Sequence, residues 1–404
     1  METRQIKGLH IAASSHIQQD GKLWIVPSQT SNRKYTVRYG RKEQTCTCPD
    51  FESRRRPCKH IHAVYAHLHP TQITQIPELP RKPTYKQAWH EYNKAQTNEK
   101  AKFQELLYEL CRGIESLPKK PGAGRTRLPL GEMIFAVVFK VYSLISGRRF
   151  ISDLKETQRR GYISRCPHFN SIFNYLELEE MTDCLTSLIS QSSLPLKAIE
   201  QDFAVDSSGF STGIATRWFK TKYSDEPEEI SMMGWLKAHI MCGVKTNIVT
   251  SVEISDGYSN DILYFKPLVE ATSQNFKLRE VSADKAYLSA ENLRQVAAKG
   301  AESYIPFKIN SNAHHYNDKS GVWYRLWHYY SYNNNEFMMH YHKRSNVETT
   351  FSMIKAKFGE RLRSKTATAQ KNEILCKVLC HNLCCLVQSM YELGVEIDCW
   401  KRWH

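Results

Sequence analysis

The sequence predicts an α/β protein in which a small β-rich segment and an all-helical region precede a sheet with flanking helices. Short apolar runs that end at turn residues, such as Phe203–Val205 and Val281–Ala283, are typical of buried strands. Longer apolar stretches at helical spacing fill residues 129–200. The formal net charge of +15 favours a polyanionic partner, DNA before membrane.

The first 70 residues form the predicted β-rich segment. Lys22–Pro27 and Lys34–Tyr39 are predicted strands, and Lys59–His67 is a predicted short helix. Between them lies Cys46-Thr-Cys48, followed after nine residues by Cys58-Lys-His60. Three thiolates and one imidazole are the ligands of a closed tetrahedral zinc site, which would hold so short a segment together. The alternative is a set of chance cysteines in a β-rich module.

The spacing of Cys46, Cys48, Cys58 and His60 resembles that of the SWIM zinc finger. The resemblance implies one structural Zn²⁺ in a module over residues 1–70. Arg54-Arg55-Arg56 make this module basic, so we expect it to bind DNA or protein as an accessory. A zinc ion with four protein ligands has no open position for catalysis.

Residues 71–128 are predicted to be a proline-marked linker and an amphipathic helix. The apolar stripe of that helix, Phe103–Leu117, suits either a core or a dimer contact. The basic stretch Pro118–Arg127 would track phosphates or keep a loop solvated. Residues 129–200 are predicted helical, and two of these helices, Phe150–Arg160 and Phe169–Leu178, are joined by a short basic connection. This arrangement suits either a helix–turn–helix that reads DNA or a packing platform.

The chain is predicted to be strand-rich from Phe203 onward. Gly234–Val244 and Asn247–Ser255 are predicted to pair antiparallel, followed by a helix at Ile262–Ala271. Asn260 and Asp261 are expected to cap that helix. His239 is expected in the core or on a sheet face. Trp323 and Trp327 are expected to serve either the core or base stacking. A buried helix, rather than a metal site, is expected for the group Cys376, Cys380, Cys384 and His381.

Residues 341–355 carry two stripes on a predicted helix. At about 100° per residue, Tyr341, Arg344, Glu348 and Lys355 share one arc. Val347, Phe351 and Ile354 occupy a neighbouring arc that can be buried. A lone glutamate among cations is usually a solvated face, but that interpretation poorly explains why four polar residues lie on one side.

Two aspartates provide partners for Glu348. Asp206 ends one apolar run and Asp284 ends another, and ligands of α/β sheets collect at the carboxyl ends of strands. Each aspartate alone is most often a turn or capping residue. With Glu348, they form a set that two Mg²⁺ ions could bridge.

The spacing of Tyr341, Arg344, Glu348 and Lys355 resembles the Tyr-Arg-Glu-Lys signature of one large group of bacterial insertion-sequence DDE transposases. The resemblance covers roughly residues 125–390. It implies an RNase H-like domain over residues 201–395, in which Asp206, Asp284 and Glu348 are catalytic and hold two Mg²⁺ or Mn²⁺ ions. Only 63 residues (285–347) separate Asp284 from Glu348, which leaves no room for a large inserted β-subdomain.

The resemblance also implies a function, namely binding of element ends followed by metal-dependent DNA cleavage and strand transfer. Tyr341, Arg344 and Lys355 would position terminal phosphates, and Lys285 and Lys357 would add backbone contacts. The expected partner is double-stranded DNA, and two ends make a homodimer the expectation. The alternatives are a DNA-binding regulator or a nuclease derived from a transposase.

The expected location is the prokaryotic cytoplasm, with the protein associated with the nucleoid. Twelve cysteines without an apolar N-terminal signal region argue for a reducing compartment. The most apolar run, Met133–Ile145, contains Lys140 and is shorter than the about 20 residues that span a bilayer. No membrane association is expected.

Overall fold

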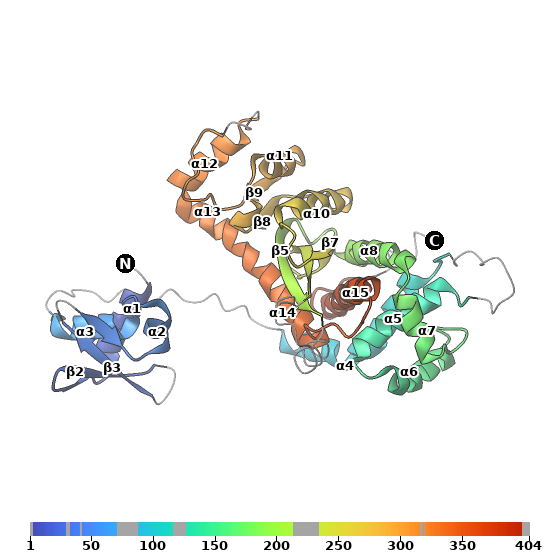
Figure 1. Ribbon diagram of the computed structural model, residues 1–404, viewed down its shortest axis with the longest axis horizontal. Coiled ribbons are helices and arrows are strands. Elements are labelled where there is room, and N and C mark those ends of the chain that lie inside the picture. The colour runs from blue at the N-terminus through green and yellow to red at the C-terminus, as the bar shows by residue number, and fades with distance from the viewer. Residues whose placement is uncertain are drawn as a thin grey trace, which may run out of the picture. The chain divides into compact units, whose positions relative to one another are not determined.

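The computed structural model describes residues 3–29, 33–40, 43–70, 88–115, 127–212, 234–315, 318 and 320–397. The predicted linker around Pro77–Pro83 lies outside these residues. The predicted basic stretch Pro118–Arg127 also lies outside them, except for Arg127. The chain divides into an N-terminal unit, Met1–Gln87, and a C-terminal unit, Ala88–His404 (Figure 1). Each unit is described by itself.

In its described residues, the N-terminal unit is a four-stranded antiparallel sheet with three helices. Its strands pair in the order β1-β2-β3-β4, and α1 packs against α3. The elements are α1 (Thr3–Ser14), β1 (Gln18–Asp20), β2 (Leu23–Pro27), β3 (Lys34–Tyr39), β4 (Gln44–Cys46), α2 (Pro49–Arg54) and α3 (Lys59–Leu68). The two strands and the helix predicted here are present, whereas α1 was not predicted. The core of the N-terminal unit includes Trp24, Val26, Val37 and Ile61, together with three cysteines.

A group of helices opens the C-terminal unit. They are α4 (Trp89–Cys111), α5 (Leu130–Ser143), α6 (Gly147–Arg159), α7 (Phe169–Leu176) and α8 (Glu179–Ser193). The apolar stripe of α4 is buried at Phe103, Leu107 and Leu110, so within this chain it serves the core. The helix begins at Trp89, well before the predicted stripe, and its earlier turns also bury Ala95 and Glu99.

The sheet of the C-terminal unit has five strands in the order β7-β6-β5-β8-β9. Strand β5 pairs antiparallel with β6 and parallel with β8, and β6 pairs antiparallel with β7. The strands are β5 (Asp202–Ser211), β6 (Trp235–Gly243), β7 (Val249–Asp256), β8 (Glu280–Ala283) and β9 (Glu302–Tyr304). This mixed sheet, with helices on both faces, has the predicted RNase H-like arrangement.

The helices divide between the two faces of this sheet (Figure 1). On one face, α10 (Ile262–Asn275) and α11 (Ala290–Ala298) cover Phe203, Val205 and Val281. The other face carries Ala204, Phe210 and Ile240, which pack with α14 (Ser345–Phe358) and α15 (Ala367–Glu392). Between β9 and α14 lie α12 (Val322–Tyr332) and α13 (Asn334–Tyr341). No β-subdomain interrupts the described part of this segment.

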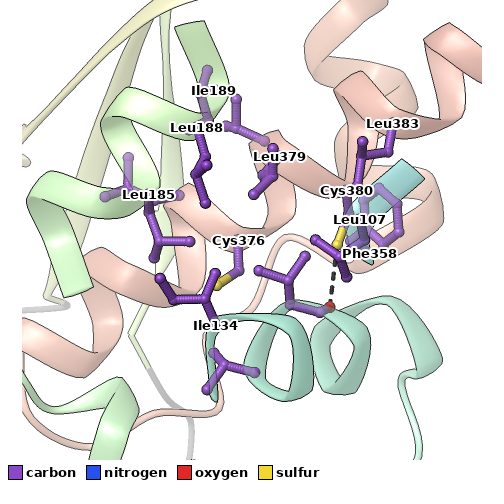
Figure 2. Packing of buried hydrophobic residues seen from close by; sticks show 14 of the residues in the cluster. Leu107, Ile134, Leu185, Leu188, Ile189, Phe358, Cys376, Leu379, Cys380 and Leu383 are labelled. Carbon is purple, nitrogen blue, oxygen red and sulfur yellow. Dashed lines mark hydrogen bonds between the residues drawn. The ribbon is translucent and has the colours of Figure 1, made fainter. Parts of the chain in front are cut away.

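Helix α15 lies at the centre of the larger core. Cys376, Leu379, Cys380 and Leu383 pack against α4, α5 and α8, as Figure 2 shows from close by. The Cys380 thiol donates to the carbonyl oxygen of Val138, at 3.4 Å. These cysteines are therefore core residues, as predicted. By length and hydropathy α15 could cross a membrane, but 78% of its apolar window is buried inside the protein, as expected for a core helix.

Two smaller expectations meet different outcomes at the start of α10. The Asn260 side chain accepts the backbone N–H of Ile262 at 3.3 Å and so caps the helix. Asp261 does not cap it, because its carboxylate accepts from the Lys237 ammonium at 2.9 Å.

His239 is fully buried on the sheet face, as predicted, where it stacks on Tyr264. Trp323 is a core residue whose indole donates to the carbonyl oxygen of Asn312.

Candidate active site and zinc site

The four zinc-finger residues converge in the N-terminal unit. Cys46, Cys48, Cys58 and His60 are buried, and their ligating atoms all lie within 4.8 Å of one another. The sequence places them on three elements, at the end of β4, before α2 and at the start of α3. The His60 Nδ1 atom lies 3.8 Å from the Sγ atoms of both Cys46 and Cys58.

These distances fit a tetrahedral zinc ion. Bond lengths of about 2.3 Å to sulfur and about 2.0 Å to nitrogen place adjacent ligand atoms roughly 3.6 Å apart. Hydrogen bonding with Cys46 lowers the pKa of the Cys58 thiol, whereas the hydrogen bond with Cys58 raises the pKa of the Cys46 thiol and burial raises that of Cys48. One thiolate is thus favoured among the three cysteines, and thiolate is the form that binds metal.

The first two acids of the second site are brought together by strand pairing. In the parallel register of β5 and β8, Val205 lies beside Ala283. The next residues are Asp206 and Asp284, so both carboxylates emerge side by side where β8 ends. Asp284 then starts a 3₁₀ turn, η4 (Lys285–Tyr287), and accepts the backbone N–H of Lys285 at 2.6 Å.

Glu348 reaches the same place from α14. The helix lies on the face of the sheet that carries Asp206, and it buries Val347, Phe351 and Ile354, as its apolar stripe predicted. Burial raises the pKa of Asp206, and the charges of Asp284 and Glu348 raise it further. The Ser207 backbone N–H and the Arg344 guanidinium oppose this rise. The three predicted acids therefore share one electrostatic environment.

The helix that carries the signature is not continuous, which corrects the expectation of one helix over residues 341–355. Helix α13 ends at Tyr341, a 3₁₀ turn (η5, His342–Arg344) follows, and α14 begins at Ser345. Side chains three residues apart eclipse in a 3₁₀ turn. This geometry brings the Arg344 Nε atom to 3.3 Å from the Tyr341 hydroxyl oxygen, which accepts its hydrogen bond.

Arg344 joins two of the acids. Its Nη1 atom donates to Asp206 Oδ2 and its Nη2 atom donates to Glu348 Oε1, each at 2.6 Å. The ammonium of Lys355 lies farther along α14, 5.4 Å from the centre of the Phe210 ring. Lys285 is exposed next to Asp284. These cations lie around the acids or along β5.

Lys357 lies elsewhere. Its ammonium is bound to the Glu99 carboxylate of α4 at 2.5 Å and contacts the Cys384 sulfur at 3.4 Å. Its pairing with Glu99 places the Lys357 ammonium against the helical core rather than beside Asp206. The role of Lys357 as a DNA contact stays a prediction.

A second ionic cluster was missed by sequence reasoning. The Lys343 ammonium donates to Asp202 at 2.8 Å and to Glu280 at 2.6 Å, and Arg279 binds Asp202 through two nitrogens at 2.7 Å. This cluster fixes the 3₁₀ turn to the sheet. A signal was present, because Asp202 and Glu280 each precede a site aspartate by four residues and lie opposite each other in the parallel register.

Two family models match the chain. Residues 197–383 match the transposase DDE domain, and residues 35–69 match the SWIM zinc finger. No curated protein and no solved structure matches. The first match contains Asp206, Asp284 and Glu348, and the second contains all four cysteine and histidine ligands. The chain thus carries a transposase DDE domain preceded by a SWIM zinc finger.

Proposed function

We propose that this protein is the DNA transposase of an insertion sequence, which binds the element ends and catalyses strand cleavage and strand transfer. The observation that carries the proposal is the convergence of Asp206, Asp284 and Glu348 from two neighbouring strands and one helix. Carboxylate oxygens are the ligands that Mg²⁺ and Mn²⁺ prefer. When bound, two such ions activate the attacking hydroxyl and stabilise the leaving oxygen of a phosphodiester.

The residues around the acids have complementary roles in this proposal. Asp206 and Asp284 hold fixed positions on the sheet, and Glu348 approaches from the helix to complete the ligand set. Arg344 has the planar fork that binds a phosphate through two nitrogens. Tyr341 orients that fork through its hydroxyl, and Lys355 and Lys285 supply further positive charge for the DNA backbone.

Other parts of the chain would bind DNA away from the acids. The helix pair α6 and α7 carries arginines on its surface, among which Arg148 stacks on Phe169 and Arg159 pairs with Glu156. We assign the recognition of element ends to this pair, and an accessory contact with DNA or protein to the zinc finger. Two ends must be handled together, so a homodimer on DNA is part of the proposal.

The test is a strand-transfer assay with Mg²⁺ on a duplex that carries the inverted repeat flanking the gene. Wild-type protein is expected to join the repeat to target DNA. Asp206→Asn, Asp284→Asn and Glu348→Gln should each lose at least about a thousandfold in rate while still binding the duplex, because each removes a metal ligand. Glu180→Gln, which neutralises an exposed acid in the first turn of α8, is the matched control and should stay active.

Other outcomes of this assay would point to the alternative functions. Cleavage of any duplex without joining would indicate a nuclease, and binding of the repeat without any reaction would indicate a DNA-binding regulator. Retention of full strand transfer in Asp206→Asn would contradict the proposed role of the acids.

A further inference from the structure

The guanidinium of Arg344 occupies the place between two of the three acids. It binds Asp206 Oδ2 and Glu348 Oε1 at 2.6 Å each, and its third nitrogen donates to Tyr341. The arginine side chain is only 17% exposed. Short bonds between charged groups that are partly shielded from water are strong, so the bond to Asp206, whose side chain is 21% exposed, is the stronger arm of the bridge.

The bridge and a divalent cation compete for the same oxygens. Mg²⁺ and Mn²⁺ approach carboxylate oxygens to within about 2.0–2.6 Å, closer than a guanidinium nitrogen does. A cation bound to Asp206 and Glu348 would therefore meet the charge of Arg344 at the same site. Among the described residues, only the cysteine–histidine cluster has all of its ligand atoms within 4.8 Å of one another. The carboxylate oxygens of the three acids therefore lie farther apart than the ligand atoms of that cluster.

The backbone that carries Arg344 is held in place. Lys343, in the same 3₁₀ turn, binds Asp202 and Glu280 at the start of β5 and β8. Both carboxylates are shielded, at 13% and 12% exposure, which strengthens the attachment of the turn. The turn therefore stays on the sheet, and release of the acids requires a change only in the side chain of Arg344.

We propose that Arg344 is an exchangeable occupant of the metal site, which keeps Asp206 and Glu348 neutralised until a DNA phosphate draws the guanidinium away. The inference rests on the proposed function of the acids and adds a means of regulation to it. A phosphate offers the same two-pronged partner as the carboxylates. By linkage, DNA and divalent metal then strengthen each other's binding by the same factor. Metal would bind weakly in the absence of DNA, which restrains cleavage at unintended places.

The test measures Mn²⁺ binding to the full zinc-loaded chain by the paramagnetic resonance signal of free Mn²⁺. Without DNA, Arg344→Gln is expected to bind Mn²⁺ about tenfold or more tightly than wild type, corresponding to about 1.4 kcal/mol of competition. Arg279→Gln is the matched control. It removes one positive charge from the neighbouring ionic cluster but leaves Lys343 to hold the turn and leaves the bridge intact, and it should change the affinity by less than about threefold.

Addition of the inverted-repeat duplex should tighten Mn²⁺ binding by wild type about tenfold, and by Arg344→Gln much less. Arg344→Lys is a second variant in case the first fails to fold. It keeps the charge but offers no fork, and it should fall between the other two. Equal affinities for wild type and Arg344→Gln, or equal effects of Arg344→Gln and Arg279→Gln, would overturn the proposal.

Asp206→Asn separates the failure of this inference from the failure of the proposed function. If Asp206→Asn binds Mn²⁺ as wild type does, the acids are not the metal site, and both proposals fall. If Asp206→Asn loses binding but Arg344→Gln gains none, the metal site stands and only the role of Arg344 is rejected.

Discussion

The N-terminal unit keeps its four metal ligands inside its own small core, whereas the C-terminal unit keeps its three acids where a strand ends, outside both of its cores. Cys46, Cys48 and Cys58 belong to the apolar cluster of the N-terminal unit. Asp206 and Glu348 are partly exposed, at 21% and 57%. A site of the first kind supports the fold, and a site of the second kind leaves coordination positions open for substrate.

The largest expected difference is the effect of losing metal ligands on folding. Cys58→Ser should unfold the N-terminal unit, because the cysteines of the zinc site belong to its small core and the site joins β4, α2 and α3. The C-terminal unit should keep its structure. Hydrogen exchange followed by mass spectrometry checks this, with fast exchange expected over residues 3–70 and unchanged protection in α15. Cys166→Ser, which alters a half-buried cysteine of the other unit, should leave residues 3–70 protected.

The opposite result would remove the contrast between the two sites. If purified protein folds with slow exchange over residues 3–70 and a zinc stoichiometry near zero, the cysteine–histidine cluster is not a structural metal site.

In the C-terminal unit, a buried ion pair rather than a structural metal ion stabilises the fold. The Lys377 ammonium, 2% exposed, donates to the carbonyl oxygens of Gly359 and Arg361 at 2.9 Å and lies 3.4 Å from the Glu373 carboxylate. Lys377→Met should cost roughly 3–5 kcal/mol in the free energy of unfolding, because it leaves Glu373 buried without its cation. Denaturant unfolding measures this cost. The exposed pair of Arg159 and Glu156 is the control, and Arg159→Met should cost less than about 1 kcal/mol.

Acid should weaken the C-terminal unit through its buried histidines. Burial lowers the pKa of His381 to about 4, while its ring donates to the Asn247 carbonyl oxygen at 2.9 Å. The unfolded chain takes up this proton near pH 6.5, so it binds more protons than the folded chain as the pH falls toward 4. This difference amounts to about 3 kcal/mol at pH 4.

The measurement is unfolding free energy between pH 7 and pH 4. His381→Gln cannot take up the proton, so its stability should fall less steeply over this window than that of wild type. His239, whose pKa is also lowered to about 4 by burial, remains in both proteins and adds the same slope to each. Parallel pH profiles would show that His381 does not titrate in this way.

The smallest expected effect on stability belongs to the acidic site. Glu348→Gln removes a half-exposed carboxylate and one exposed ion pair, so the free energy of unfolding should change by less than about 1 kcal/mol. Strand transfer should nevertheless be lost. Thermal unfolding and the strand-transfer assay on the same preparation test both statements. A large loss of stability would mean that Glu348 supports the fold, as the zinc ligands do.

Much of the fold could be predicted because local patterns carried it. The apolar runs that end at Asp206 and Asp284, the stripe of α14 and the cysteine spacing each depend on residues close together in the chain. Helix α1 was missed, because its few large apolar residues, Ile6, Leu9 and Ile11, form only a weak helical pattern. The 3₁₀ turn at His342–Arg344 was also missed, because it follows from contacts with β5 and β8 rather than from local propensity.

The partners of individual cations could not be predicted. Arg344 and Lys343 are adjacent in the chain, yet one binds Asp206 and the other binds Asp202 and Glu280. Lys357 lies two residues beyond Lys355 but binds Glu99 of a distant helix. Charge and spacing identify a basic surface, whereas the pairing of each charge depends on packing across more than a hundred residues.

The central position of α15 has a consequence for synthesis of the protein. A growing chain that has reached residue 360 already contains every strand of the described residues and all three acids, but it lacks the helix around which α4, α5 and α8 pack. Those helices would expose their apolar faces until residues 367–392 leave the ribosome. Packing of the helices that surround the acidic site is thereby delayed until α15 has been made, and a chain that ended before α15 should fail to form that core.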